Sequence, residues 1–320
     1  MKPRTDLTNL FVVLAMLVLS LGGATSASAG PPNPALGLDK APRLAIISAY
    51  APELEALKAQ AHIQKVVVLN GRSVYVGTLA GHQVLLTLSG ISMVNAAMTT
   101  QALIDHFQVK RIIFSGIAGG VNPSLNIGDV VIPARWSEYQ ENLFARETAP
   151  GVFAPPDWFQ VTLTNYGMLF PQDVDICTAR GTPDEETPVV WFPVDPAMLK
   201  VATRVAGTVD LDQCTLQEVC LGTTPVVRPG GNGVSGPTFV DNASYRDYAW
   251  GTWQTDALDM ESAAVAHVAT VNGVPFIIFR SLSDLAGGGP GENEIDIFFQ
   301  LAADNSAKVI MAFLKAWPKR

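Results

Sequence analysis

The sequence has 320 residues, 48% of them hydrophobic and 16% charged, and its formal net charge is −8. This length supports one large α/β domain with a sizeable core. The acidic balance, with no run of Lys or Arg, argues against nucleic acid or an anionic membrane as a partner and leaves a small molecule as the expected ligand.

The first 29 residues have the pattern of a secretory signal peptide. Lys2 and Arg4 precede an apolar run at 10–21, and Ala-Ser-Ala at 27–29 follows as a cleavage site. The run is too short for a comfortable membrane span, and no cysteine follows it to accept a lipid. We therefore expect an exported protein, periplasmic or secreted, with no membrane contact after cleavage. An uncleaved anchor is the alternative.

Residues 30–42 hold four prolines and two glycines and are expected to form a flexible leader before a single domain at 43–320. The apolar run at 44–48 then predicts a strand. A short helix is expected to follow, with Pro52 at its first position, where the missing N–H has no cost, and Glu53 in its first turn. Glu53 therefore lies directly beyond the carboxyl end of a strand.

Asn-Gly and Gly-His breaks separate the next three apolar runs, 66–69, 74–79 and 83–88, which predicts an antiparallel meander. A helix is expected from 93 to 107, followed by a strand at 111–115. The apolar stripe predicted for this helix consists of Val94, Ala97, Met98, Ile104 and Phe107.

The strand at 111–115 leads into the glycine-rich segment 116–120, Gly-Ile-Ala-Gly-Gly. Glycines at the end of a strand let the backbone approach a ligand closely. A tight turn is the simpler alternative, because the segment matches neither GxGxxG nor a phosphate-binding P-loop. Another short strand is expected at 128–133.

The segment 135–233 is expected to be an irregular insertion in the domain, because it holds many prolines and isolated aromatic residues with little periodicity. Long irregular segments of this kind usually act as lids, binding loops or partner surfaces. One helical pattern, at 195–206, stands out within it.

All three cysteines lie in this insertion. In an oxidising compartment Cys214 and Cys220 could close a short loop and leave Cys177 free, and three reduced thiols are the alternative. The four histidines show no metal-ligand spacing, so neither a metal nor another cofactor is expected.

The stretch 257–284 organises the C-terminal part of the chain. Its small residues predict a helix from about Met260 to an Asn-Gly stop at 272–273. The apolar run at 274–279 predicts a buried strand that ends in a polar loop. A strand-like run at 235–240 precedes the stretch. The closing helix, from 296 to about 317, is expected to lie on the sheet through Phe299, Ala302, Ala303, Ile310 and Phe313.

The polar loop after the predicted strand at 274–279 is the candidate site. Ligands bind outside the carboxyl ends of the strands in open α/β sheets. This places Arg280, Ser283 and Asp284 at a site mouth, which Glu261 can reach from the start of the preceding helix. Two carboxylates in one cleft are candidates for acid/base work or for binding hydroxyl groups.

Six segments between Leu44 and Asp284 can be compared with known families: LAIISAYAPELEAL, SGISMVNAA, FSGIAGGVNPSLNIGDVVIP, GPTFV, ALDMESAAVAHV and VPFIIFRSLSD. In this order they resemble the nucleoside phosphorylase/hydrolase superfamily, in particular the 5′-methylthioadenosine/S-adenosylhomocysteine nucleosidases and their secreted relatives such as plant bark storage proteins. The resemblance implies a nucleoside phosphorylase-like α/β fold with three layers, α/β/α, and a mixed central sheet.

By this resemblance Glu53 matches the catalytic carboxylate that activates the attacking water, and Asp284 matches the acid at purine N7. Glu261 matches the carboxylate that takes the ribose 2′- and 3′-hydroxyls. The other matches in the substrate site are Met260 beside the sugar, Phe239 and Val240 at the base, Ala118 and Gly119 in the loop beside it, Arg280 near the reacting centre, and Ser283.

The expected chemistry needs these residue types. Breaking an N-glycosidic bond produces a cationic sugar and a purine that must be protonated as it leaves. Asp284 could share that proton only if burial raises its pKa. Glu53 is expected to stay ionised through solvent or the helix N-terminus, and Glu261 is expected to be ionised too. Taken singly, both glutamates could be ordinary first-turn carboxylates, Asp284 a loop cap, Arg280 a surface cation and Phe239 a core residue.

The resemblance therefore implies an exported purine nucleosidase that acts on adenine nucleosides, forms a homo-oligomer and needs no cofactor. A phosphorylase is the first alternative; it would need clustered arginines to hold phosphate, for which Arg43, Arg72 and Arg280 are the candidates. A non-catalytic storage or nucleoside-binding protein is the second. Ile117 and Tyr50 depart from the family's usual residues, which leaves the 5′ substituent of the substrate open.

Overall fold

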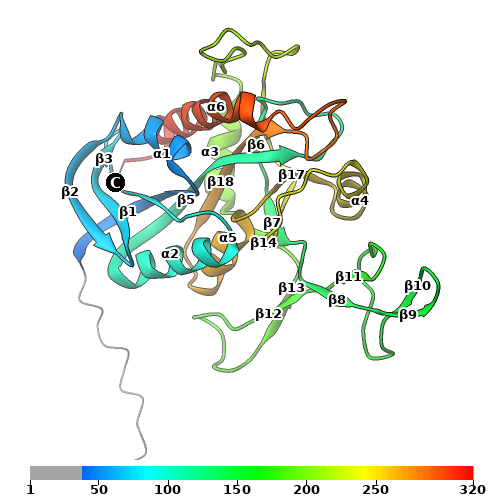
Figure 1. The fold of residues 1–320 in the computed structure, drawn as a ribbon. Coiled ribbons are helices and arrows are strands. Elements are labelled where there is room, and N and C mark those ends of the chain that lie inside the picture. Colours follow the sequence, from blue (N-terminus) through cyan, green and yellow to red (C-terminus); the bar gives the residue numbers. More distant parts are fainter. Residues whose placement is uncertain (1–37, 320) are drawn as a thin grey trace, which may run out of the picture. The chain divides into compact units, whose positions relative to one another are not determined.

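The computed structural model of the chain describes residues 38–319 (Figure 1). The predicted signal peptide and the first part of the predicted leader lie outside the described residues. The end of the leader is not a free segment, because the first strand, β1 (Asp39–Ser48), begins before residue 43. The early start is explained by pairing of Asp39 with Phe107 in the neighbouring strand and by an ion pair between Asp39 and Arg43.

A mixed sheet of 12 strands forms the middle layer of the fold. Its other strands are β2 (His62–Leu69), β3 (Arg72–Leu79), β4 (His82–Leu88), β5 (Phe107–Gly120), β6 (Val130–Ile132), β7 (Arg135–Glu138), β14 (Phe192–Pro193), β15 (Val227–Pro229), β16 (Asn232–Ser235), β17 (Thr255–Asp259) and β18 (Phe276–Asp284). β5 lies at its centre, parallel to β1 and β18 and antiparallel to β17. The predicted meander is β2, β3 and β4, and β4 returns parallel to β1.

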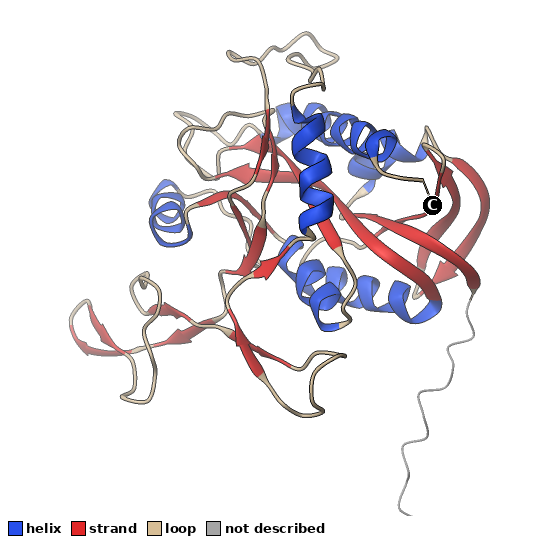
Figure 2. Cartoon of the chain, turned by 180° about the vertical axis from the view of Figure 1, so that it is seen from behind, coloured by secondary structure: helices blue, strands red, loops and turns tan. Residues whose placement is uncertain are grey.

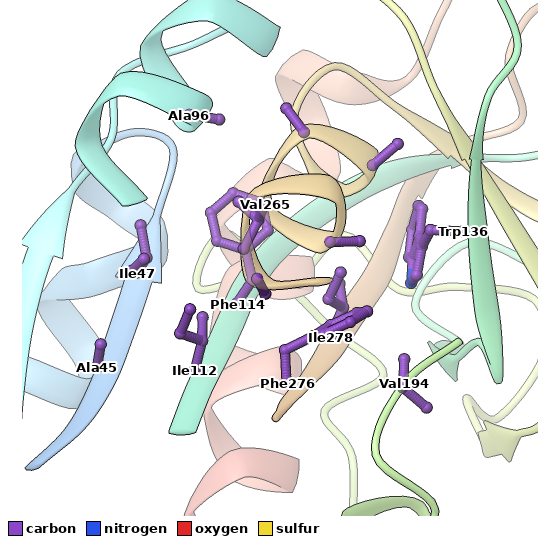
Figure 3. Packing of buried hydrophobic residues seen from close by; sticks show 14 of the residues in the cluster. Ala45, Ile47, Ala96, Ile112, Phe114, Trp136, Val194, Val265, Phe276 and Ile278 are labelled. Carbon is purple, nitrogen blue, oxygen red and sulfur yellow. The ribbon is translucent and has the colours of Figure 1, made fainter. Parts of the chain in front are cut away.

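Six helices pack on this sheet or at its edge in the described part of the chain: α1 (Ala51–Lys58), α2 (Met93–His106), α3 (Pro196–Ala206), α4 (Ala243–Trp253), α5 (Ser262–Val271) and α6 (Ile295–Ala316). Because side chains alternate along a strand, Ala45, Ile47 and Phe114 face α2 and α5 (Figure 3), whereas Ile46 and Ile113 face α1, α3 and α6. The predicted three-layer α/β/α fold with a mixed central sheet is confirmed.

Helix α6 is long and apolar enough to span a membrane by length and composition. Its apolar side is instead buried in the domain, where Ile310 and Phe313 pack on the same face of the sheet as Ile277 and Phe279. The expected contact of this helix with the sheet is therefore present at Ile310 and Phe313, but the prediction is wrong for Phe299, which is half-buried and lies outside this cluster.

The stripe predicted for α2 is partly wrong. Val94 is 78% exposed and Met98 is 47% exposed, while Ala96 and Leu103 are buried in the core beneath the helix. The helix turns its small residues inward because α5, its neighbour on this face, is also built from small residues and the two helices pack closely.

Two predicted loop segments are strand. β18 continues through Arg280 to Asp284, because it pairs with the glycine-rich end of β5 on one side and with β6 on the other. The segment 116–120 is thus the extended end of β5, and the tight-turn alternative is wrong. The strand predicted at 235–240 is wrong beyond Ser235, where β16 ends.

Short antiparallel pairs fill the first part of the predicted insertion. They are β8 (Asn142–Phe144) with β11 (Leu169–Pro171), β9 (Arg146–Ala149) with β10 (Val152–Ala154), and β12 (Val174–Ile176) with β13 (Thr187–Val189). These pairs project from the sheet in both views (Figures 1 and 2). Helix α3 lies where the helical pattern predicts it, Cys214 is disulfide-bonded to Cys220, and Cys177 is an exposed free thiol.

Candidate active site

A cleft of about 390 Å³ opens at the carboxyl ends of β1, β5 and β18. All the residues assigned to the site from the sequence line it, with the exception of Arg280. Most of its wall is apolar, and a few carboxyl groups converge on it, which is the usual character of a small-molecule site. The full lining is Ala49, Tyr50, Glu53, Ile91, Ile117, Ala118, Gly119, Thr238, Phe239, Val240, Leu258, Asp259, Met260, Glu261, Ser283, Asp284, Ile295, Asp296 and Phe299.

Glu53 folds back from the first turn of α1 over the end of β1, and its side chain is 2% exposed. Its Oε2 accepts hydrogen bonds from the N–H groups of Ala49 (2.7 Å) and Tyr50 (3.2 Å), and its Oε1 accepts one from Ile117 (3.0 Å). Burial raises the pKa of this carboxyl, while Arg280 and the N–H donors oppose the rise. The expectation that solvent keeps Glu53 ionised is therefore wrong. The charged form is favoured instead by the guanidinium of Arg280 and by the backbone N–H donors.

Arg280 is fully buried behind the wall of the cleft, so the surface-cation alternative is wrong. Its Nε lies 2.6 Å from Oδ2 of Asp259, its Nη2 lies 3.3 Å from Oε2 of Glu261, and its Nη1 lies 3.7 Å from Oε1 of Glu53. The guanidinium also lies 4.5 Å from the centre of the Phe114 ring. One cation thus faces three carboxylates from three different elements.

Asp259 is a member of this group that the sequence reasoning missed. Its Oδ1 accepts hydrogen bonds from the Ser235 hydroxyl (2.5 Å) and from the N–H groups of Glu261 (3.1 Å) and Ser262 (3.0 Å), and its Oδ2 accepts one from the Ser262 hydroxyl. It therefore joins the end of β17 to the start of α5. The available signal was an acidic residue placed between a short strand and a helix start.

The glycines at the end of β5 make room for these side chains. An ideal Cβ on Gly116 would lie 2.1 Å from Nη1 of Arg280 and 2.5 Å from Oε1 of Glu53. A Cβ on Gly119 would lie 3.1 Å from Oδ1 of Asp284. The close approach predicted for this segment is thus an approach to the protein's own charged groups, at least at Gly116.

Glu261 precedes the first residue of α5 and is held from two sides. Its Oε1 accepts a hydrogen bond from the N–H of Ser92 (2.8 Å), and its Oε2 faces Arg280. Burial, with help from the neighbouring Asp259 and Glu53, raises its pKa to about 7 against the pull of Arg280. Glu261 was expected to be fully ionised, but with this pKa it titrates near neutral pH.

Asp284 is the last residue of β18 and lies in the cleft without a cation at its carboxyl group among the described residues. Its Oδ1 accepts hydrogen bonds from the N–H of Ala286 (2.8 Å) and from Nδ2 of Asn293 (3.4 Å), and its Oδ2 accepts one from the Ser283 hydroxyl (2.9 Å). Burial raises its pKa, and the nearby Asp241 adds to the rise.

Larger apolar side chains form the rim. Phe239 is 51% exposed and follows the end of β16, so the alternative of a core residue is wrong. Val240 is buried beside it, and Met260 lines the same wall. Tyr50 and Phe299 also line the cleft, and burial raises the pKa of the Tyr50 hydroxyl.

The arrangement suits acid/base chemistry on a small ligand that carries a flat apolar part. Across residues 38–319, no group of three or more His, Cys, Asp or Glu side chains is placed to hold a metal ion. The reactive groups that the cleft does offer are carboxyls in two environments: Glu53, Asp259 and Glu261 face the buried guanidinium, whereas Asp284 and Asp296 do not.

Comparison with known proteins agrees with this geometry. The family model described as "Phosphorylase superfamily" matches residues 43–315. The 5′-methylthioadenosine/S-adenosylhomocysteine nucleosidase of Tolumonas auensis is 30% identical over 274 residues, which cover 85% of this chain and 99% of that protein. The nucleosidase of the same name from Geobacillus kaustophilus is 28% identical over 279 residues, 87% of this chain and 99% of that protein.

Solved structures show the same likeness. The crystal structure of the Neisseria meningitidis 5′-methylthioadenosine/S-adenosylhomocysteine nucleosidase, in complex with methylthio-immucillin-A, has a TM-score of 0.63 and 28% identity. The match covers 86% of this chain and 99% of that chain.

Proposed function

This chain belongs to the phosphorylase superfamily, and from that premise we propose that it hydrolyses the N-glycosidic bond of adenine nucleosides to free base and sugar. The proposed substrates are of the methylthioadenosine, S-adenosylhomocysteine or adenosine type, since the relatives carry the name of such a nucleosidase. With them it shares the activity class of an N-glycosyl hydrolase. The N-terminal signal pattern supports the further proposal of export, to the periplasm or outside the cell.

The observation that carries this proposal is the difference between two buried carboxyl groups in one cleft. Burial raises the pKa of both groups, but at Glu53 three N–H donors and a guanidinium 3.7 Å away oppose the rise and favour the ionised form. Asp284 has no such cation and lies near Asp241, which favours its protonated form. Environments that push the pKa values of two carboxyls apart are how enzymes set an acid against a base.

The proposed reaction uses both groups. Asp284 gives its proton to the purine as the glycosidic C–N bond breaks, and the bonding electron pair stays on the base. A water molecule adds to C1′ of the sugar, and Glu53 takes one of its protons. Glu261 accepts the ribose hydroxyls and places negative charge near the developing cation of the sugar. Acid assistance of this kind is typically worth about 10²–10⁴-fold in rate.

The test is incubation of the chain without its first 29 residues with adenosine, methylthioadenosine and inosine, each with and without phosphate, while free base and sugar are measured. Glu53→Gln should abolish turnover and leave nucleoside binding largely intact, because it removes the base and retains the side chain's shape. Glu55→Gln is the matched control, since Glu55 lies in the same helix but is exposed and paired with Lys58. Turnover by Glu53→Gln at the parent rate would overturn the assigned role.

Phosphorolysis has less support than hydrolysis. The cleft lining of the described chain contains no arginine, and the guanidinium of Arg280 is occupied by carboxylates. Arg43 binds Asp39 near the amino end of β1, away from the cleft at the other end of that strand. A strict requirement for phosphate, with a sugar 1-phosphate as product, would nevertheless assign the chain to the phosphorylases.

The storage or nucleoside-binding alternative predicts no release of base under any condition. The burial of Glu53, Glu261 and Asp284 in one cleft argues against it, since a storage role needs none of them there. Asp284→Asn sharpens the distinction: it should slow purine release by far more than it changes the melting temperature, and an unchanged rate would remove Asp284 from the mechanism.

We also propose that the chain forms a homo-oligomer. Support comes from large apolar side chains that are exposed on α2 (Val94 and Met98), on β8 (Phe144) and in the loop between β10 and β11 (Trp158). Light scattering on the purified chain tests this, and a monomer at all accessible concentrations would overturn it.

A further inference from the structure

Asn293 lies in the loop between β18 and α6 and touches the proposed acid. Its Oδ1 accepts a hydrogen bond from the N–H of Ile295 (3.0 Å), which fixes the orientation of the side-chain amide. The Nδ2 group therefore points to two carboxylates and donates to Oδ1 of Asp241 (3.1 Å) and Oδ1 of Asp284 (3.4 Å). One amide thus joins the first turn of α6 to the end of β18.

We propose that Asn293 is a positioning residue for Asp284, and that its amide assigns the acidic proton of Asp284 to Oδ2. This inference rests on the proposed function only for its catalytic consequence, because the placement of the proton is a property of the free protein. The resemblance and the comparisons assign no role to Asn293.

The hydrogen bonds at the two oxygens of Asp284 carry the assignment. Oδ1 already accepts from two N–H groups, those of Ala286 and Asn293, and N–H donors cannot reverse their direction. A proton on Oδ1 would face both of them. Oδ2 has one neighbour, the hydroxyl of Ser283, which can rotate.

The Ser283 hydroxyl has a second acceptor within reach, to which it can turn when Oδ2 of Asp284 is protonated. Its hydroxyl lies 2.9 Å from Oδ2 of Asp284 and 3.4 Å from the carbonyl oxygen of Ala118. When Asp284 is ionised, the hydroxyl donates to Oδ2. When Oδ2 carries the proton, the hydroxyl can donate to Ala118 instead and leave the acidic O–H free for the ligand. The Asp284 side chain therefore gains and loses its proton without an unsatisfied partner.

Other charged groups surround this pair, and the assignment must hold among them. Asp241 shares the amide of Asn293, and Asp296, in the first turn of α6, lines the same cleft. The carboxylate of Glu294 lies beside the loop at Gly289. Arg246 of α4 reaches the same loop, but its Nε donates to the carbonyl of Gly120. Asp241, Asp296 and Glu294 thus surround the amide that Asn293 donates to Asp284. Among these acidic side chains, loss of the amide donor favours the protonated form of Asp284.

The experiment compares Asn293→Ser with a matched change, Asn242→Ser. Both asparagines accept an N–H near the start of a helix: Asn242 is the N-cap of α4 and accepts from Tyr245, and Asn293 precedes the N-cap of α6 and accepts from Ile295, two residues on. Serine can replace asparagine in both kinds of bond. Asn242 makes no side-chain contact with Asp284 among the hydrogen bonds of the described chain. A difference between the variants therefore reports loss of the amide donor that Asp284 shares with Asp241.

For Asn293→Ser we expect kcat to fall about 10-fold, the equivalent of one hydrogen bond to a charged group, with a smaller change in KM. The alkaline limb of the pH profile should move to higher pH, because Asp284 holds its proton more strongly without the donor. Asn293→Asp should move the limb further in the same direction, since it places a third carboxylate beside Asp241. Asn242→Ser should match the parent in both measurements.

A readout without turnover separates this inference from the proposed function. Infrared difference spectra between the parent and Asp284→Asn isolate the carboxyl band of Asp284, whose titration can be followed in the parent and in Asn293→Ser. A midpoint that moves to higher pH in Asn293→Ser supports the inference even if no nucleoside is cleaved. An unchanged midpoint overturns it, and so does the same shift in Asn242→Ser.

Discussion

Replacing Gly116 by alanine tests the central arrangement of the site, in which one guanidinium holds carboxylates from three elements. The new Cβ would lie 2.1 Å from Nη1 of Arg280 and 2.5 Å from Oε1 of Glu53, where carbon normally stays more than about 3.4 Å from either atom. Both side chains are buried and have further partners, so neither can move aside without losing hydrogen bonds.

The expected cost has two parts. Overpacking of a well-packed interior costs roughly 1–3 kcal/mol, and weakening a buried ion pair adds to this. We therefore expect Gly116→Ala to lower the free energy of unfolding by about 2–4 kcal/mol, which corresponds to a fall in melting temperature of roughly 5–12 °C for a domain of this size. Turnover should fall by at least about 100-fold, because displacement of a catalytic group by 1 Å costs that much.

The assay is thermal unfolding followed by circular dichroism, together with the rate of base release. Gly207→Ala is the matched control, because Gly207 ends α3 at φ −79° and a Cβ there meets no atom within 4 Å. The control should melt at or slightly above the parent temperature. If Gly116→Ala melts and turns over like Gly207→Ala, the guanidinium and Glu53 are not held as described.

Three further predictions concern stability. Ser92 has φ 83° and ψ 157°, a region that glycine adopts freely, so Ser92→Gly should raise the free energy of unfolding by about 1 kcal/mol in denaturant titrations, and a loss would show that the conformation is not strained. Glu261 has a pKa of about 7 in the folded chain against 4.5 in the unfolded chain, so the folded state binds more protons between these pH values. The free energy of unfolding of the parent, relative to Glu261→Gln, should therefore grow by roughly 3 kcal/mol as the pH falls from 8 to 4. A difference that does not change with pH would contradict the raised pKa. Reduction of the Cys214–Cys220 disulfide, which closes a short loop, should cost about 2 kcal/mol, and Cys214→Ala/Cys220→Ala should show the same loss and no further response to reductant.

Local patterns in the sequence predicted the main strands and helices and the positions of the acidic residues, whereas the three-layer fold and most of the other cleft residues were implied by the family resemblance. The apolar runs at 44–48 and 274–279 are long enough to specify buried strands, and the small residues after Met260 specify a tightly packed helix. The acidic residues Glu53 and Asp284 follow or end such strands, so the chain order alone placed both of them at one edge of the sheet.

What the sequence could not supply depends on pairing between distant segments. Arg280 and Asp284 are polar, and nothing near them indicates that β5 and β6 flank them and extend the strand through them. The same is true of Asp259, whose partners Ser235 and Arg280 come from other strands. The direction of the α2 surface was also unpredictable from its own residues, because the small side chains of α5 decide which face can approach.

The shared guanidinium has a consequence for how this site can change in evolution. Glu53, Asp259 and Glu261 each face Arg280, so loss of one of them strengthens the hold of the cation on the other two. The effects of substitutions among these four residues should therefore be strongly non-additive. Few single substitutions can then convert this set of residues into a different functional set without loss of function on the way. The apolar rim is free of this coupling. A lineage can exchange residues such as Phe239 and Phe299 one at a time, and so alter which ligands enter while the buried charges stay as they are.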